Sequence, residues 1–238
     1  MISPTASAVV LLAALLPSAL AQTHSDCNPL EKKGCPNMPA LGGNATFNLK
    51  EKWNDDVWKK VNQGTVRTND FGTTFTVAKE GDSAQLQSKF YMLFGRLEVV
   101  LKAAPGQGII SSAILQSEAL DEIDWEFKGI NNSRVSTAYF GKANMDNPLE
   151  RGHDFDMAPT QDDFHNYTID WTKDRIQWWV DDKMIRELKE ADAKPNANHF
   201  PQTPMNIRIG PWAGGDVKNN AKGVVVSLPV TRQWYCEC

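Results

Sequence analysis

The stretch that most constrains the fold of this chain is residues 121–127, DEIDWEF, in which acidic and apolar residues alternate. A period of two residues is typical of a β-strand, because successive side chains point to opposite faces of a sheet. Glu122, Asp124 and Glu126 therefore share one face, and apolar residues share the other. The apolar face predicts a strand packed on a core. The acidic face needs its own explanation, because like charges in a row repel one another.

Two carboxyl groups that flank a sugar linkage would explain the acidic row. A retaining glycosidase uses one as nucleophile and a second, protonated one as general acid and then base. A third acid between them would raise the pKa of the neighbour that must hold a proton. A solvated edge face or a calcium site would explain the row as well, and spacing alone leaves these alternatives open. Glu122 and Glu126 lie roughly 13 Å apart on an ideal strand, whereas a retaining pair needs about 5–5.5 Å, so catalysis requires a curved strand whose side chains lean toward Asp124.

Three separated motifs resemble those of one enzyme family. EIDWE at residues 122–126 fits the unbulged E-x-D-x-E signature of glycoside hydrolase family 16. GRLEVVLKAAPGQG at residues 95–108 and PQTPM at residues 201–205 resemble the fungal CRH (Congo-red-hypersensitive) branch, the transglycosylases that crosslink chitin to glucan in the cell wall. The resemblance runs from about Cys27 to about Gly223, and the motifs follow the order of the family.

Short runs of β-branched and aromatic residues, separated by glycine-containing turns, predict an all-β chain. The expected strands lie at residues 73–77, 84–88, 94–103, 109–115, 135–139, 164–171, 175–180, 183–188 and 205–215. Residues 188–193 are a modest helical candidate, and residues 141–160 are expected to form a loop beside a cleft. The pattern is typical of an antiparallel β-sandwich or jelly roll. The family resemblance implies a jelly roll whose concave sheet holds the glycan.

The N-terminus has the features of a secretory signal peptide, which we expect to span residues 1–21. Residues 9–16 form a short apolar run, and Ala19-Leu20-Ala21 fits a cleavage site, although no Lys or Arg precedes the run. The run is too short to span a membrane. We find no other long apolar segment and no hydrophobic C-terminal tail that could direct a GPI anchor. We therefore expect a protein secreted to the cell exterior or the wall without an anchor.

Composition indicates a single catalytic domain that spans residues 22–238. A chain of 238 residues, 41% of them hydrophobic, can bury a sizeable single core. The net charge of −4 and the lack of a Lys and Arg cluster argue against nucleic acid as a partner. No internal repeat or low-complexity linker marks a second domain, and we expect a monomer.

Cysteines and sequons fit a secreted protein. Cys27 and Cys35 lie in the loop CNPLEKKGC, for which a disulfide is expected in an oxidising compartment, and the family resemblance implies one here. A metal site is the weaker alternative, because two isolated thiols make a poor zinc site, and we expect no metal. Asn44, Asn131 and Asn166 begin N-x-S/T triplets and are candidate glycosylation sites.

A second functional stretch lies at residues 205–215, where Arg208, Gly210 and Trp212 alternate onto one face. An aromatic ring can stack on a pyranose, and Arg can donate hydrogen bonds to hydroxyl or acetamide oxygens. The resemblance implies that Arg208 and Trp212 bind chitin. Without it, a core Trp and a surface Arg would be the simpler interpretation. The family has a further contact, a Thr after a Gly, but here Gly223 is followed by Val224 and the contact is not carried over.

Three other conspicuous side chains have simpler explanations. His165 lies in an expected strand, where a lone histidine is more often a hydrogen-bonded structural residue than a catalytic one. Trp178 and Trp179 are consecutive in an expected hairpin strand and point to opposite faces, so at most one can face the glycan. The core is the default place for the other.

The resemblance ends at Val224. The family continues with a Glu-Trp-Ala-Gly-Gly run and further strands, whereas this sequence has a different ending, residues 224–238. We therefore expect missing C-terminal strands, an unpaired sheet edge and a partly uncovered apolar face. Cys236 and Cys238 are expected to have no structural partner.

The expected mechanism is retaining double displacement. Glu122 attacks the anomeric carbon of a β-1,4-linked chitin donor, while Glu126, which also contacts the substrate, protonates the leaving oxygen. Asp124 holds Glu122 by hydrogen bonding and modulates the pKa values of both. Glu126 then deprotonates the acceptor, a hydroxyl of β-1,3/1,6-glucan or chitin, or water. The chemistry requires no metal and no organic cofactor.

Two other functions remain open at this stage. A family 16 β-glucanase would use the same chemistry on a different donor. A catalytically impaired, lectin-like protein of the wall would bind glycan without turnover. The intact E-x-D-x-E set argues against pure binding, because binding alone would not need three aligned acids.

Overall fold

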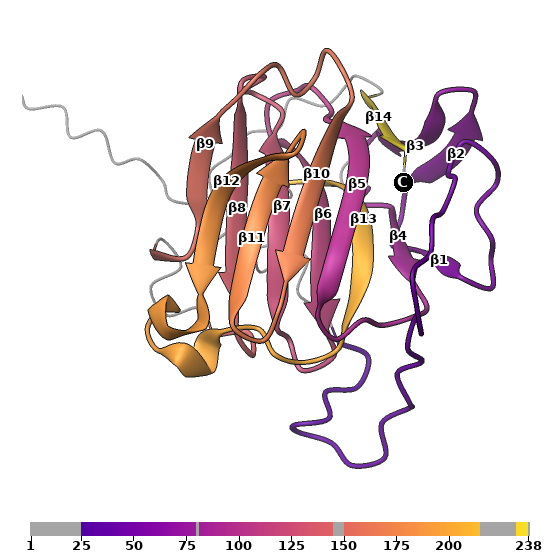
Figure 1. The fold of residues 1–238 in the computed structure, drawn as a ribbon. Helices are drawn as coiled ribbons and strands as arrows, with labels where there is room; N and C mark the ends of the chain where they lie inside the picture. The colour runs from indigo at the N-terminus through magenta and orange to yellow at the C-terminus, as the bar shows by residue number, and fades with distance from the viewer. Residues whose placement is uncertain (1–24, 80, 145–149, 215–231, 238) are drawn as a thin grey trace, which may run out of the picture.

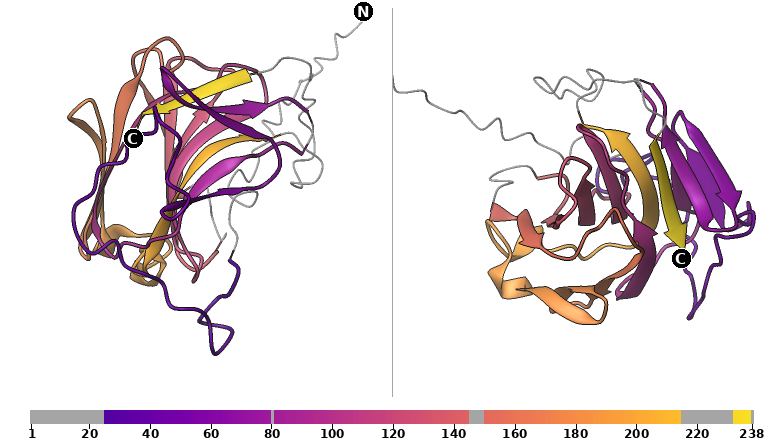
Figure 2. Two further views of the ribbon diagram at one scale, coloured as in Figure 1. Left: turned by 90° about the vertical axis from the view of Figure 1, so that its right-hand side faces the viewer. Right: turned by 90° about the horizontal axis from the view of Figure 1, so that it is seen from above.

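The computed structural model describes residues 25–79, 81–144, 150–214 and 232–237, the last of these by its backbone alone. Two seven-stranded sheets pack face to face as a β-sandwich (Figure 1). Neighbouring strands in both sheets run antiparallel. Figure 2 shows the sheets as two curved layers. The expected antiparallel all-β fold is confirmed.

One sheet carries the acidic row and is called the acid sheet; the other is called the backing sheet. The order of the acid sheet is β1-β4-β13-β6-β7-β8-β9. Its strands are β1 (Trp58–Val61), β4 (Gln85–Ser88), β13 (Met205–Ala213), β6 (Ile109–Ser117), β7 (Glu122–Lys128), β8 (Arg134–Phe140) and β9 (His153–Asp156). The order of the backing sheet is β12-β11-β10-β5-β14-β3-β2. Its strands are β12 (Lys183–Lys189), β11 (Arg175–Val180), β10 (His165–Trp171), β5 (Gly95–Lys102), β14 (Arg232–Glu237), β3 (Gly72–Val77) and β2 (Thr65–Asn69).

The core lies between the two sheets and takes in the apolar face of β7. Ile123, Trp125 and Phe127 are fully buried. The rings of Trp125 and Phe127 meet the ring of Tyr167 from β10 edge-on, with centroids 5.4 and 4.6 Å away. Aromatic pairs in this geometry stabilise a core beyond the area that they bury. The alternation in residues 121–127 thus fixes which face of β7 is left for the acids.

Two local predictions are wrong. The expected loop at residues 141–160 contains strand β9, which pairs with β8. Its sequence HDFD has little apolar character, because β9 is an exposed edge strand. The expected helix at residues 188–193 is instead the end of β12 followed by one 3₁₀ turn, η3 (Glu190–Asp192), because the ladder with β11 extends to Lys189.

The C-terminal prediction also needs correction. Strand β14 lies between β3 and β5 and pairs with both, so the backing sheet has no unpaired edge at this position. Its sequence RQWYCE contains aromatic residues that favour strands. The departure from the family at Val224 and the thiol groups of Cys236 and Cys238 lie outside what is described. Among the described residues, no helix is both long and apolar enough to cross a membrane.

Candidate active site

The three acids lie at the centre of the acid sheet. β7 pairs with β6 and β8 without a register shift, so that Glu122, Asp124 and Glu126 lie opposite Gln116, Ile114 and Ser112 of β6. This regular pairing agrees with the unbulged form of the motif. The acids point away from the core, because the residues between them are packed into it.

The acidic row is buried, which excludes the solvated edge face. Glu122 and Asp124 are each only 2% exposed, Glu126 is partly buried, and strands flank β7 on both sides. The described residues contain no group of three or more His, Cys, Asp and Glu side chains arranged to hold a metal ion. Three carboxyl groups in a row on one strand face, two of them buried and the third partly buried, cannot all ionise at neutral pH without a large electrostatic cost.

The pKa values of two of the acids reflect this crowding. Burial and the charge of Glu122 raise the pKa of Glu126 to about 7; Asp154 adds to the shift and Lys128 opposes it. Burial, the charges of Glu122 and Glu126, and a hydrogen bond with Glu122 together raise the pKa of Asp124 well above its usual range. Both groups therefore hold protons at a pH where an ordinary carboxyl group has lost its own.

Neighbouring side chains orient Glu122 and Asp124. The Gln116 amide donates a hydrogen bond of 2.6 Å from Nε2 to Oε2 of Glu122. On the core side, the Trp178 indole donates from Nε1 to the backbone oxygen of Asp124 at 3.1 Å, which ties the backing sheet to the centre of β7. Trp178 is thus the core member of the tryptophan pair, and Trp179 lies partly buried on the other face of the backing sheet.

Arg208 and Trp212 share the face of the acids. Arg208 lies opposite Ile114 of β6, which lies opposite Asp124, so these three form one row across β13, β6 and β7. Arg208 and Trp212 are each 4% exposed, and Trp212 is not part of the core cluster between the sheets. Burial lowers the pKa of Arg208, whereas the charges of Glu122 and Glu118 oppose that shift. The interpretation of Arg208 as an ordinary surface residue is therefore wrong.

A polar network links the acid face to the N-terminal loop. The Glu118 carboxylate accepts hydrogen bonds from the Tyr91 hydroxyl at 2.7 Å, from the Ser25 hydroxyl at 2.8 Å and from the Asp26 backbone N–H at 3.1 Å. Burial and the bond to Glu118 raise the pKa of Tyr91 to about 12, so its hydroxyl remains a donor. Asn206 of β13 accepts a hydrogen bond from the Nε of Arg208 at 3.0 Å, and the charge of Glu118 acts on Arg208 across this network. Sequence reasoning missed this network, because its members are far apart along the chain.

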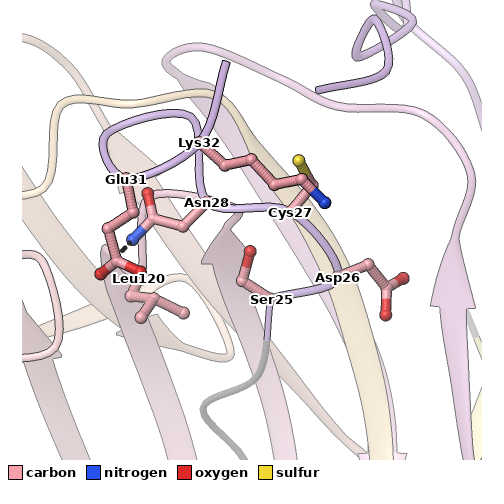
Figure 3. A pocket seen from close by; sticks show the side chains of 7 residues that line it. All are labelled: Ser25, Asp26, Cys27, Asn28, Glu31, Lys32 and Leu120. Carbon is pink, nitrogen blue, oxygen red and sulfur yellow. Dashed lines mark hydrogen bonds between the residues drawn. The ribbon is translucent and has the colours of Figure 1, made fainter. Parts of the chain in front are cut away.

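Two cavities, of about 340 and 400 Å³, border the N-terminal loop rather than the acidic row. The side chains around the smaller one come from residues 25–32 and from Leu120, and include the hydrogen-bonded pair Asn28 and Glu31 (Figure 3).

Cys27 and Cys35 form the expected disulfide, with Cα atoms 5.6 Å apart. His165 is held at Nδ1 by Asp181 and at Nε2 by the Pro159 carbonyl, which fits a structural role.

Asp121, just before the acidic row, holds together the chain around the site. Its buried carboxylate accepts hydrogen bonds from the backbone N–H groups of Lys142 and Gln202, at 3.0 and 2.9 Å. It also accepts one from the Thr203 hydroxyl at 2.6 Å. The PQTPM motif thus contains two of the donors for this carboxylate, an arrangement that sequence reasoning did not predict.

The Asp121→Ala variant is expected to unfold with a free energy lower by about 3 kcal/mol, because it leaves three donors without their charged acceptor. Thr203→Val removes one of the three bonds and should cost about 1 kcal/mol. Denaturant unfolding of the two variants beside the parent protein measures both values. Equal stability of Asp121→Ala and the parent would show that this carboxylate does not anchor the segments around it.

The chain is similar to known proteins over most of its length. The family model for glycosyl hydrolases family 16 matches residues 52–230, which is most of the chain. The chain belongs to this family. The match includes all of β7 and β13, and therefore every residue of the acidic row together with Arg208 and Trp212.

Within family 16, the chain is similar to Crh-like proteins. A Crh-like protein of Arthroderma benhamiae is 48% identical over 219 residues, which cover 92% of this chain and 59% of that protein. Crh-like protein 2 of Botryotinia fuckeliana is 46% identical over 229 residues, which cover 92% of this chain and 49% of that protein. The chain thus spans about half to three-fifths of the length of these relatives.

Solved structures of family 16 agree with this placement. The apo Crh5 transglycosylase matches with a TM-score of 0.80 and 41% identity, covering 89% of this chain and 88% of that one. A Crh5 transglycosylase structure in complex with NAG matches equally well. A Bacillus licheniformis β-glucanase matches with a TM-score of 0.66 and 20% identity over 82% of this chain and 97% of that one, which shows a shared fold. The expected membership of family 16 and likeness to its Crh branch are confirmed.

Proposed function

We propose that this chain is a retaining transglycosylase of the fungal cell wall, which cleaves β-1,4-linked chitin and transfers it to β-1,3/1,6-glucan or chitin acceptors. The observation that carries the proposal is the buried, regularly spaced acidic row, in which Glu126 has a pKa of about 7 beside Glu122. The similarity to Crh-like proteins and to the Crh5 transglycosylase supports the class of reaction. The NAG complex of that transglycosylase supports an amino-sugar donor.

In the first step, a Glu122 oxygen attacks the anomeric carbon of the donor and the glycosidic bond breaks. Glu126 gives its proton to the leaving oxygen, and a covalent glycosyl ester forms on Glu122. Asp124 assists as a hydrogen-bond donor to Glu122, because the bond between the two carboxyl groups needs one proton and the raised pKa of Asp124 assigns it there. Among the described residues the Oδ1 atom of Asp124 is buried without a partner, which a neutral carboxyl group tolerates better than a charged one.

In the second step, the acceptor hydroxyl attacks the anomeric carbon, gives its proton to Glu126 and displaces Glu122 as a carboxylate. The electrostatics of the row favour this exchange of roles. The charge of Glu122 raises the pKa of Glu126 in the free enzyme. That charge is absent in the glycosyl ester, so the pKa of Glu126 falls and its carboxylate becomes available as the base.

Arg208 and Trp212 are proposed to bind the chitin donor. Both lie on the face of the acids, and Arg208 is close enough to Glu122 for their charges to interact. The Nε1 donor of Trp212 is buried without an acceptor among the described residues. A glycan oxygen would satisfy this donor, and a buried polar group gains most from a partner that it otherwise lacks.

Arg208→Met in a Glu122→Gln background is expected to weaken binding of a chito-oligosaccharide by roughly 10–100-fold, the range for one lost hydrogen bond to a charged group. Isothermal titration calorimetry measures this directly. Arg96→Met is the matched control, because Arg96 is a partly exposed arginine of the backing sheet. Equal weakening by both substitutions would contradict a donor-binding role for Arg208.

Secretion and glycosylation complete the proposal. We infer that the protein acts at the wall after removal of residues 1–21, as the expected signal peptide and the similarity to Crh-like proteins suggest. Asn44 is the best glycosylation candidate, since its whole triplet is exposed. By contrast, the Asn131 side chain accepts hydrogen bonds from Ser133, and Thr168 of the third triplet is buried.

The test of the proposed function is a transfer assay with a chito-oligosaccharide donor and a fluorescent laminari-oligosaccharide acceptor. Larger labelled products establish transfer. Donor shortened without a labelled adduct would indicate hydrolysis, and labelled products formed only from a β-glucan donor would favour the β-glucanase alternative. Folded protein that binds the donor without any product would favour the lectin-like alternative.

A further inference from the structure

A charged cluster beside Glu126 has no part in the mechanism above. Glu126 lies opposite Ser136 of β8, and Ser136 lies opposite Asp154 of β9, so these three form one row across the acid sheet. Lys128 follows Glu126 by two residues along β7 and therefore shares its face. The cluster lies on the side of β7 away from Arg208 and Trp212.

Asp154 is fixed by two partners. The Ser136 hydroxyl donates to its Oδ1, and the Lys128 Nζ lies 3.3 and 3.2 Å from its two oxygens. Partial burial raises the pKa of Asp154, but the Ser136 and Lys128 contacts outweigh this and hold it below its usual range. The side chains of Lys128 and Asp154 are 42% and 37% exposed, so water partly screens the pair without breaking it.

We propose that Asp154 and Lys128, the ion pair in the row beside Glu126, are opposed positioning residues that poise Glu126 between its acid and base roles, an inference that rests on the acid/base role proposed for Glu126. The negative charge of Asp154 favours the protonated form of Glu126, which must act first as an acid. The positive charge of Lys128 favours the carboxylate, which must act second as a base. Both charges act on Glu126 in these directions, beside the larger effects of burial and Glu122.

The other charged or titratable groups around Glu126 either belong to the reacting row or lie farther from Glu126 than this pair does. Along β7, Asp124 and Glu122 belong to the reacting row itself. The residue opposite on β6 is Ser112, which is uncharged. A second ion pair, Arg134 of β8 with Asp156 of β9 at 3.0 Å, lies one step farther along the same face. His153 of β9 lies opposite Thr137, and burial followed by the charge of Arg186 lowers its pKa, so it is neutral at pH 7.

The two substitutions are expected to shift the pH dependence of kcat/KM in opposite directions. Asp154→Asn lowers the pKa of Glu126. The alkaline limb of the profile, in which kcat/KM falls as Glu126 loses its proton, therefore moves to lower pH by on the order of half to one pH unit, the scale of one partly screened charge. Lys128→Met removes the ion-pair partner of Asp154 and the positive charge nearest Glu126 along β7, and the fall in kcat/KM moves to higher pH by a similar amount. The double variant should lie close to the parent protein. Both shifts should shrink at about 1 M salt.

Asp156→Asn is the matched control, because Asp156 has the same residue type and pairing on the same strand and face, one step away from Glu126. It should leave the limb in place. Each variant is expected to fold, because the substituted side chains are partly exposed. Circular dichroism checks this.

Carbon-13 NMR titration of the Glu126 carboxyl group, assigned with Glu126→Gln, separates this proposal from the proposed function. Opposite shifts of the Glu126 midpoint in Asp154→Asn and Lys128→Met support the proposal even if no protein transfers or hydrolyses glycan, in which case the proposed function fails alone. Identical midpoints in all variants, or shifts in the same direction, would overturn the role of the pair.

Discussion

Glu122→Gln is expected to abolish both transfer and hydrolysis, with a loss of roughly 10³–10⁶-fold in kcat, the scale seen when a nucleophile is removed. The amide keeps the size of the side chain and its contact with Gln116 but cannot form the glycosyl ester. Rates with a chito-oligosaccharide donor, followed by labelled acceptor products and by donor shortening, measure the loss in both reactions.

Binding distinguishes this result from simple misfolding. Glu122→Gln should bind the chito-oligosaccharide about as well as the parent protein, because Arg208 and Trp212 are unchanged. Gln116→Ala is the matched control for orientation, since it removes the donor to Glu122 and leaves the nucleophile in place. It should reduce kcat by far less than Glu122→Gln. Substantial turnover by Glu122→Gln would assign the nucleophile elsewhere.

Glu126 is expected to control the alkaline limb of the pH profile. Its pKa is raised to about 7, and the first step needs its proton, so kcat/KM should fall about tenfold for each unit above that pH. Glu126→Gln should lower the rate by about 10²–10⁴-fold with a natural chitin donor, the usual contribution of general acid–base catalysis. The alkaline limb should vanish from the residual activity.

The leaving group provides the sharper test of Glu126. An aryl chito-oligosaccharide with a nitrophenolate leaving group needs no protonation, so Glu126→Gln should form the glycosyl ester from it nearly as fast as the parent protein. A burst of nitrophenolate on mixing measures this step. An equal loss with natural and activated donors would show that Glu126 does not act as the acid.

Much of the acid face follows from local sequence. Alternation in residues 121–127 predicts both the strand and its orientation, because the three apolar side chains must enter the core. The same reasoning places Arg208 and Trp212 on one face of β13, and the pairing through β6 makes it the face of the acids. The expected hairpin of residues 175–180 and 183–188 is confirmed as well, and its two turn residues, Asp181 and Asp182, have the positive φ angles that tight hairpins require.

The remaining features depend on contacts between distant segments. β9 carries little apolar alternation, since an exposed edge strand need not face a core. The anchoring of PQTPM by Asp121 joins residues about 80 apart in sequence, and no local pattern predicts it. Similarly, Lys128 and Asp154 look like ordinary surface charges until the register of β7, β8 and β9 brings them together beside Glu126.

Capture of the glycosyl-enzyme tests the central claim most directly. Glu126→Gln, incubated with the activated aryl chito-oligosaccharide and no acceptor, should accumulate the ester, because the second step lacks its base. Mass spectrometry of the peptic digest should then show one added chito-oligosaccharyl unit on the peptide that contains Glu122, and Glu122→Gln in the same background should show none. An adduct on another residue, or rapid nitrophenolate release with no adduct and an inverted product, would contradict the double-displacement mechanism.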